Sequence, residues 1–295
     1  MIQKAEHEHQ NRLEDQQHHD EEDQEKQKDP DLQEAEERSA PTGKVVYKAI
    51  LHEGEEELER PSSALFWSGL AAGLSMGFSL VAEGLLKYYL PHAHWAPLVS
   101  KFGYSIGFLI VILGRQQLFT ENTLTPILPF LQNRKMDVFG NVARLWAVVL
   151  LANLAGAFIF AWVIAKTPAF DEGPKAAFVA LGHEAVRHGF LTVLVKGIFA
   201  GWLIALMVWL LPFAEAARVW VIILITYVVG IGQFSHIIAG SVETFTLAAM
   251  GEKSWNTVFL NWVIPTLIGN IVGGVTLVAA LNHAQVVAGG QGDDV

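Results

Sequence analysis

Six long apolar segments, two of them interrupted by polar residues, restrict the fold of this sequence more than any other feature. The segments are residues 64–90, 99–131, 139–165, 190–211, 217–249 and 256–282. A membrane-spanning helix needs about 20 consecutive, mostly apolar residues. We therefore expect an all-α membrane protein in which each segment crosses the bilayer once.

The second and fifth segments are too long for one straight span, and each contains a polar stretch. These stretches read RQQLFTENT at 115–123 and GQFSH at 232–236. Non-helical backbone is tolerated at membrane depth only where protein buries it or where it lines a water-filled cavity. We therefore predict two broken helices whose breaks face inward. One break carries the titratable ring of His236.

The two halves of the chain share three features in the same order. G-x-x-A-G occurs at 69–73 and 197–201, a polar break follows in each half, and N-x-x-G occurs at 153–156 and 270–273. Small residues are common where membrane helices pack, but their shared order indicates an internal duplication. Because each half has three spans, the second repeat must be inverted, as in many transport proteins. Asn153 and Asn270 are predicted to be structural, each hydrogen-bonding the opposite break.

Charge is concentrated at the N-terminus. Residues 1–60 hold 19 of the 30 acidic residues and 8 of the 20 basic ones, which leaves the rest of the chain almost neutral. We expect a disordered acidic tail over 1–43, with histidines that are solvated or bind a metal, and an amphipathic interfacial segment over 44–63. The transmembrane domain follows over 64–283, with a short C-terminal tail over 284–295. This pattern predicts no nucleic-acid partner.

Two further counts limit the interpretation. The chain has no cysteine, which excludes disulfides and thiolate metal sites. Basic residues flank the spans equally on both sides, six against six, so the positive-inside rule does not decide the orientation.

Several motifs resemble the formate/nitrite transporter family of bacterial inner-membrane proteins. They are ILGRQQLFTENTLTPIL, ANLAGAFIF, GWLIALMVWL, FSHIIAG and VIPTLIGNIVGGVTLV, and the resemblance covers residues 45–283. It implies an aquaporin-like protomer of six helices, a homopentamer with one pore per protomer, and a multi-pass inner-membrane location with both termini in the cytoplasm.

The resemblance also implies a pore site. The family's central pore histidine corresponds to His236, and the threonine that faces it corresponds to Thr120. Hydrophobic constrictions are expected on either side of that point, near Phe108, with Tyr104 beside it, and near Val229.

The sequence departs from the family pattern at several pore positions. Ser235 replaces a glutamate and Gly201 replaces an asparagine. Four charged residues are unusual within the spans, and they are predicted either to line the pore or to pair with one another at a protomer interface. They are Arg115, Glu121, Lys196 and Glu243.

A small anion in the membrane needs compensation for its lost hydration. The positive ends of half-helices can supply it, or the anion can take a proton and cross as a neutral acid. We expect His236 to hydrogen-bond or protonate the anion, Thr120 to orient it, and Phe108 and Val229 to exclude water. The structural alternatives are a buried histidine without function and a threonine that only caps a half-helix.

The sequence therefore predicts a channel or transporter for small monovalent anions such as formate or nitrite, with no cofactor. One alternative is a neutral-solute pore, although neither break contains Asn-Pro-Ala. Another is a non-conducting scaffold or sensor whose pore is plugged by ion pairs. No nucleophile–base pair, phosphate loop or metal cluster in the spans suggests an enzyme.

Overall fold

The computed structural model describes residues 41–286 and residue 288 of the chain, and this part contains helices and loops but no strand. The predicted acidic tail lies outside the described residues except for its last three positions, of which Gly43 begins a helix. The predicted C-terminal tail is described only at 284–286, which are helical, and at 288.

Four of the predicted apolar segments form continuous helical rods. They are α4 (Ser62–Tyr89), α8 (Met136–Lys166), α10 (Phe190–Leu210) and the consecutive elements α13 (Trp255–Val258), η4 (Phe259–Val263), α14 (Ile264–Gly274), η5 (Val275–Ala280) and α15 (Leu281–Val286). In the last rod, η4 has π-helical geometry directly before Pro265. A proline lacks the backbone donor that an α-helix needs, and a π-turn accommodates its ring.

The second apolar segment is broken as predicted. It consists of α5 (Ala96–Ser100), η1 (Lys101–Tyr104) and α6 (Ser105–Leu113), then a non-helical stretch over 114–126, and then α7 (Ile127–Asn133).

The fifth segment is also broken. Its halves are α11 (Arg218–Ile231) and α12 (Ala239–Ala249), and residues 232–238 between them are not helical. Five helices of the described part are long and apolar enough to cross a membrane, and this segment is not one of them because neither half is long enough alone.

Two helix pairs cross closely at matching positions. α4 packs on α8 and α10 packs on α14. A Cβ atom at Gly73 would lie 2.1 Å from the carbonyl oxygen of Asn153, and one at Gly201 would lie 2.3 Å from that of Asn270. Only glycine permits this backbone approach. The predicted small-residue motifs are therefore the crossing points of these helices.

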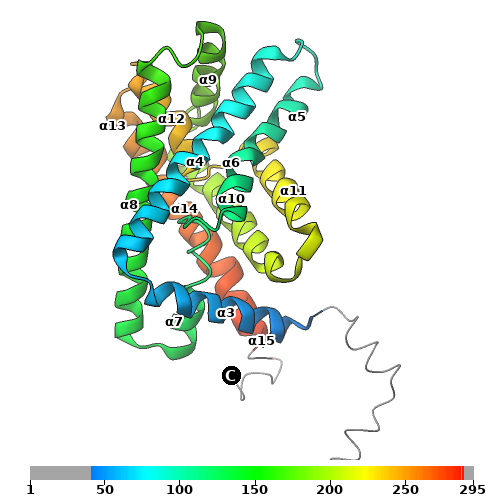
Figure 1. Ribbon diagram of the computed structural model, residues 1–295, viewed down its shortest axis with the longest axis vertical. Helices are drawn as coiled ribbons and strands as arrows, with labels where there is room; N and C mark the ends of the chain where they lie inside the picture. Colours follow the sequence, from blue (N-terminus) through cyan, green and yellow to red (C-terminus); the bar gives the residue numbers. More distant parts are fainter. Residues whose placement is uncertain (1–40, 287, 289–295) are drawn as a thin grey trace, which may run out of the picture. The chain divides into compact units, whose positions relative to one another are not determined.

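Short helices cover the two ends of the bundle (Figure 1). α3 (Gly43–Glu59), within the predicted interfacial segment, contacts α7 and α15 and buries Tyr47 and Ile50. The Tyr47 hydroxyl hydrogen-bonds His283 Nδ1 at 2.8 Å. At the other end, α9 (Glu172–Ala185), which the sequence analysis did not predict, packs on α12 and α4. One helix therefore packs at each end of the bundle.

Candidate functional site

The two breaks begin with the same backbone turn. Arg115 and Gln233, 118 positions apart, have left-handed φ angles of 52° and 49°. In both, the next residue donates its N–H to a carbonyl five positions back, and the left-handed residue donates to one three positions back. The four bonds are Gln116 N to Val111 O (3.0 Å), Arg115 N to Ile112 O (3.2 Å), Phe234 N to Val229 O (3.0 Å) and Gln233 N to Gly230 O (3.0 Å). This is a Schellman helix end in each half.

One buried asparagine holds the first break in place. Asn153 Oδ1 accepts a hydrogen bond from Phe119 N at 2.9 Å. Its amide nitrogen donates to Gly69 O at 2.7 Å and to Gln117 O at 2.9 Å. The side chain thereby satisfies two backbone groups of the break, Phe119 N and Gln117 O, and ties them to α4.

Asn270 does the same for the second break. It accepts from Ile237 N at 2.8 Å and donates to Gly197 O at 2.9 Å and Ser235 O at 2.8 Å. The prediction that each asparagine would bond the opposite break is wrong. Each holds the break of its own half, because the N-x-x-G helix of that half runs directly beside it.

His236 and Thr120 meet where the two breaks approach each other. His236 Nε2 and Thr120 Oγ1 are 2.8 Å apart, and both residues are buried. His236 Nδ1 accepts from the backbone N–H groups of Ile238 at 3.3 Å and Ala239 at 3.2 Å. Two donors on Nδ1 leave the ring proton on Nε2, which donates to the threonine hydroxyl. The histidine also caps the first turn of α12.

Apolar rings seal the layer around this contact. The Phe108 ring lies edge-on against His236, with centroids 4.9 Å apart, and Tyr104 lies 5.4 Å from Phe108. Val229 is fully buried nearby and lines the cavity described next. Phe108 therefore contacts the histidine directly and forms part of the same layer.

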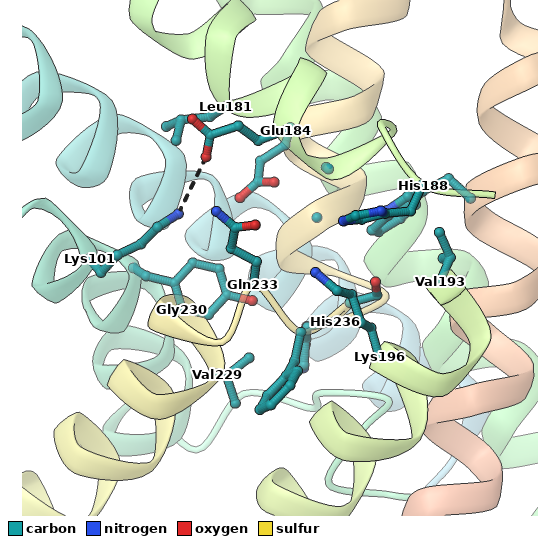
Figure 2. Close-up of a pocket in the computed structure, with 17 residues that line it drawn as sticks. Lys101, Leu181, Glu184, His188, Val193, Lys196, Val229, Gly230, Gln233 and His236 are labelled. Carbon is teal, nitrogen blue, oxygen red and sulfur yellow. Dashed lines mark ion pairs between the residues drawn. The ribbon is translucent and has the colours of Figure 1, made fainter. Parts of the chain in front are cut away.

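A small cavity of about 50 Å³ leads from the α9 end to His236 (Figure 2). We call it the α9-side cavity. Its walls come from η1, α9, α10, α11 and α12, and Ser235 is among its lining residues. Lys101 and Lys196 enter it from opposite sides in Figure 2.

A larger cavity of about 670 Å³ opens at the α3 end. We call it the α3-side cavity. α3 contributes Glu53, Glu56 and Glu57 to its wall, and the first break contributes Arg115 and Glu121. Thr120 and Phe108 line neither cavity and are 0% exposed, so a closed layer separates the two cavities.

The four unusual charges divide between the cavities. Arg115 and Glu121 line the α3-side cavity, and Lys196 and Glu243 line the α9-side cavity. Among the described residues none of the four pairs with another, and Arg115 instead pairs with Glu53 at 3.3 Å. Pairing with one another across a protomer interface stays a prediction.

Gly201 lies away from the predicted pore. It lines neither cavity and is in contact with the backbone of Asn270 at the crossing of α10 and α14. A side chain at this position has no room, so the residue serves packing.

Glu57 is a polar centre that the sequence analysis missed. Its carboxylate accepts hydrogen bonds from Gln117 Nε2 at 2.9 Å, from Asn122 Nδ2 at 3.1 Å and from the Thr125 hydroxyl. Burial raises the pKa of Glu57 from 4.5 to about 7, although these hydrogen bonds and that of Thr125 in particular oppose the shift. Glu57 thus links α3 to residues of the first break that come before and after Thr120 in the chain. In the sequence, Glu57 is distinguished only by its position on the acidic face of an amphipathic helix.

Within residues 41–286, no group of three or more His, Asp or Glu side chains could hold a metal ion. The histidines of the acidic tail lie outside the described residues. The site therefore offers one N–H donor at the meeting point of the two breaks, between two cavities that charged side chains line in part.

Comparison with known proteins agrees with this arrangement. The sequence model of the family described as "Formate/nitrite transporter" matches residues 44–284. Inner membrane protein YfdC of Escherichia coli (strain K12) is 42% identical over 273 residues, 92% of this chain and 88% of the relative. A formate-nitrite transporter of Plasmodium vivax is 28% identical over 262 residues, 82% of this chain and 83% of the relative.

Solved structures show a similar fold. A pentameric formate channel with formate bound aligns with a TM-score of 0.63 at 21% identity, covering 84% of this chain and all of that one. An FNT family ion channel aligns with a TM-score of 0.70 at 18% identity, covering 82% and 99%.

Proposed function

Because the chain belongs to the formate/nitrite transporter family, we propose that it carries small monovalent anions, such as formate or nitrite, across a bacterial inner membrane. Its own apolar helices and the name of its Escherichia coli relative support the location. The names of several relatives and of an aligned solved structure support the substrate class.

The observation that carries the proposal is the hydrogen bond between His236 and Thr120. It joins the two breaks in the closed layer that separates the α9-side and α3-side cavities. A solute that passes from one cavity to the other must part this contact.

The chemistry follows from the ring's hydrogen bonds. With Nδ1 occupied by two amide donors, His236 presents Nε2–H as a donor. An arriving carboxylate or nitrite oxygen replaces the Thr120 hydroxyl as the acceptor, and Thr120 turns its own O–H toward the anion. If the ring gives up its proton, the solute crosses as a neutral acid, which couples flux to protons.

The apolar rings complete the mechanism. Phe108 packs on the histidine and Val229 borders the α9-side cavity, so water and hydrated ions find no polar path through the layer. The neutral, weakly hydrated form of the solute is the one that passes this barrier most easily.

We place the site in a six-span protomer built from two inverted repeats over 64–283. The matched Schellman turns, 118 positions apart, and the matched glycine–asparagine crossings support the repeat. The pentameric assembly of the aligned formate channel supports a homopentamer with one pore per protomer. An even number of spans puts both termini on one side of the membrane, which we propose is the cytoplasm, with α3 as an interfacial helix over the α3-side cavity.

Uptake of labelled formate into proteoliposomes tests the proposal. Wild-type protein is expected to give uptake well above empty vesicles. His236→Ala should reduce it at least tenfold, whereas His92→Ala, which removes an exposed histidine from the α4–α5 loop, should not. Wild-type uptake equal to that of empty vesicles contradicts the function, and unchanged uptake by His236→Ala contradicts the site.

A plugged, non-conducting pore finds no support in the described residues. Its ion pairs would have to cross the central layer, but Arg115 pairs with Glu53 inside the α3-side cavity. The central layer itself consists of His236, Thr120 and apolar rings.

A further inference from the structure

One side of the α9-side cavity carries no excess of positive charge. Lys101 Nζ donates to Glu83 and also lies 4.0 Å from Glu184. Glu184 accepts from Lys87, and Glu243 lies beside the same group of charges. Three carboxylates therefore lie beside two ammonium groups on this side, which does not attract an anion.

Lys196 enters the cavity from the opposite side (Figure 2). It lies in the second turn of α10, and it is one of the four charges that are unusual within the spans. Among the described residues it forms neither an ion pair nor a side-chain hydrogen bond, although it lines the same cavity as His236. A charged group inside an apolar span is costly unless an opposite charge compensates it. A solute in the cavity can supply that charge.

Arg187 adds a second cation with neutral partners at the rim. Its Nε donates to His188 Nε2 at 2.9 Å, and a terminal nitrogen donates to Gln233 Oε1 at 2.5 Å. His188 and Gln233 both line the cavity. A histidine that accepts from a guanidinium is neutral, as is a glutamine, so the arginine charge is not compensated by them. Positive charge is therefore concentrated where Lys196 enters, within range of Arg187.

Lys196 also lies beside the break that carries His236. Its neighbour in the chain, Gly197, accepts a hydrogen bond from Asn270 Nδ2 at 2.9 Å. The same asparagine side chain holds the backbone on either side of His236. Because Lys196 and His236 line one cavity of about 50 Å³, a solute of a few heavy atoms can contact both.

We infer that Lys196 binds the anion in the α9-side cavity and positions it for His236. The inference rests on the proposed transport function and adds to it the residue that selects for negative charge. The ammonium group binds one oxygen of a carboxylate or of nitrite, and another oxygen accepts from His236 Nε2–H. A neutral histidine donates to an uncharged carbonyl oxygen as well as to an anion, whereas the charge of Lys196 favours the anion.

Nitrite and formamide separate charge from shape, because both are bent molecules of the same size as formate and only formamide is neutral. Each is added unlabelled to inhibit the uptake of labelled formate into proteoliposomes. For the wild type we expect half-inhibition by nitrite at a concentration at least tenfold lower than by formamide, because only nitrite forms a charge-assisted hydrogen bond with the ammonium group.

Variants assign this preference to Lys196. Lys196→Met keeps the length of the side chain and removes its charge. It should raise the formate concentration at half-maximal uptake at least tenfold and reduce the difference between nitrite and formamide to less than threefold. Lys196→Arg keeps the charge and should stay within threefold of the wild type. Lys253→Met, which removes an exposed lysine from the α12–α13 loop outside the cavity, should change neither value.

A lysine that only packs would lower the maximal rate or the yield of folded protein without altering either value. If Lys196→Met fails to fold, Lys196→Gln is the second uncharged variant. Equal inhibition of the wild type by nitrite and formamide overturns the inference and leaves the proposed function intact. So does an unchanged half-maximal concentration in a folded uncharged variant. Wild-type formate uptake equal to that of empty vesicles overturns the proposed function and the inference with it.

Discussion

Replacing Glu57 by glutamine should change how the stability of the protein depends on pH. Burial raises the pKa of Glu57 from 4.5 to about 7 in the folded protein. Between these values the folded state holds a proton that the unfolded state has lost, so wild-type stability falls as pH rises from 4.5 to 7 and levels off above 7. The carboxylate is then fully charged in both states.

The size of the effect follows from the same pKa change. A difference of one pKa unit corresponds to about 1.4 kcal/mol, so a rise from 4.5 to about 7 gives an upper limit of roughly 3 kcal/mol. For a chain of this size, about 1 kcal/mol shifts the melting temperature by about 2–4 °C. The difference in melting temperature between wild type and Glu57→Gln should therefore change by roughly 6–12 °C between pH 4.5 and pH 7.5.

Thermal unfolding in detergent, followed at several pH values, measures this difference. Because the comparison is between two proteins at each pH, groups common to both cancel. Glu55→Gln removes an exposed carboxylate from the same helix without touching the break, and its curve should follow the wild type. If the Glu57→Gln difference stays constant across this range, the carboxyl is not held in the environment described here.

Three further changes test the packing and the site. Asn270→Ala should destabilise the protein by about 3 kcal/mol or more, measured by thermal unfolding, because Ile237 N and Ser235 O in the break lose their partner and Gly197 O loses its bond to the side chain. Gly201→Ala should prevent or severely weaken folding, because its Cβ would lie 2.3 Å from a backbone oxygen. Gly140→Ala should be tolerated, because no atom lies within 4 Å of the added Cβ. Expression and size-exclusion profiles that do not differ between the two variants would contradict this expectation. Thr120→Val should lower formate uptake at least tenfold with an unchanged melting temperature if the hydroxyl orients the anion beside His236, and unchanged uptake would assign it a packing role.

Much of the fold could be predicted from the sequence because lipid imposes simple rules. The lengths of the apolar segments and the polar stretches within two of them were enough to locate both breaks. The contact of His236 with Thr120 was expected from the family resemblance and is present. Periodicity alone does not indicate which residues meet between two breaks.

Other features depend on geometry that the sequence does not contain. Matching the two breaks by their shared phenylalanine would pair Phe119 with Phe234, whereas the asparagine contacts relate Phe119 to Ile237. A difference of three residues is almost one helical turn, so only the hydrogen bonds fix the register. Glu57 was missed because its partners lie 60 or more positions away in the chain.

A single introduced cysteine can show whether the transported solute passes the layer at His236. The chain has no cysteine, so Ser235→Cys places the only thiol in the α9-side cavity next to the histidine. Its modification by a negatively charged methanethiosulfonate should abolish formate flux, and formate should slow the reaction. His92→Cys, at an exposed position of the loop between α4 and α5, should be modified without loss of flux. Full flux through completely modified Ser235→Cys, with the extent of labelling confirmed by mass spectrometry, would show that the solute does not pass this layer.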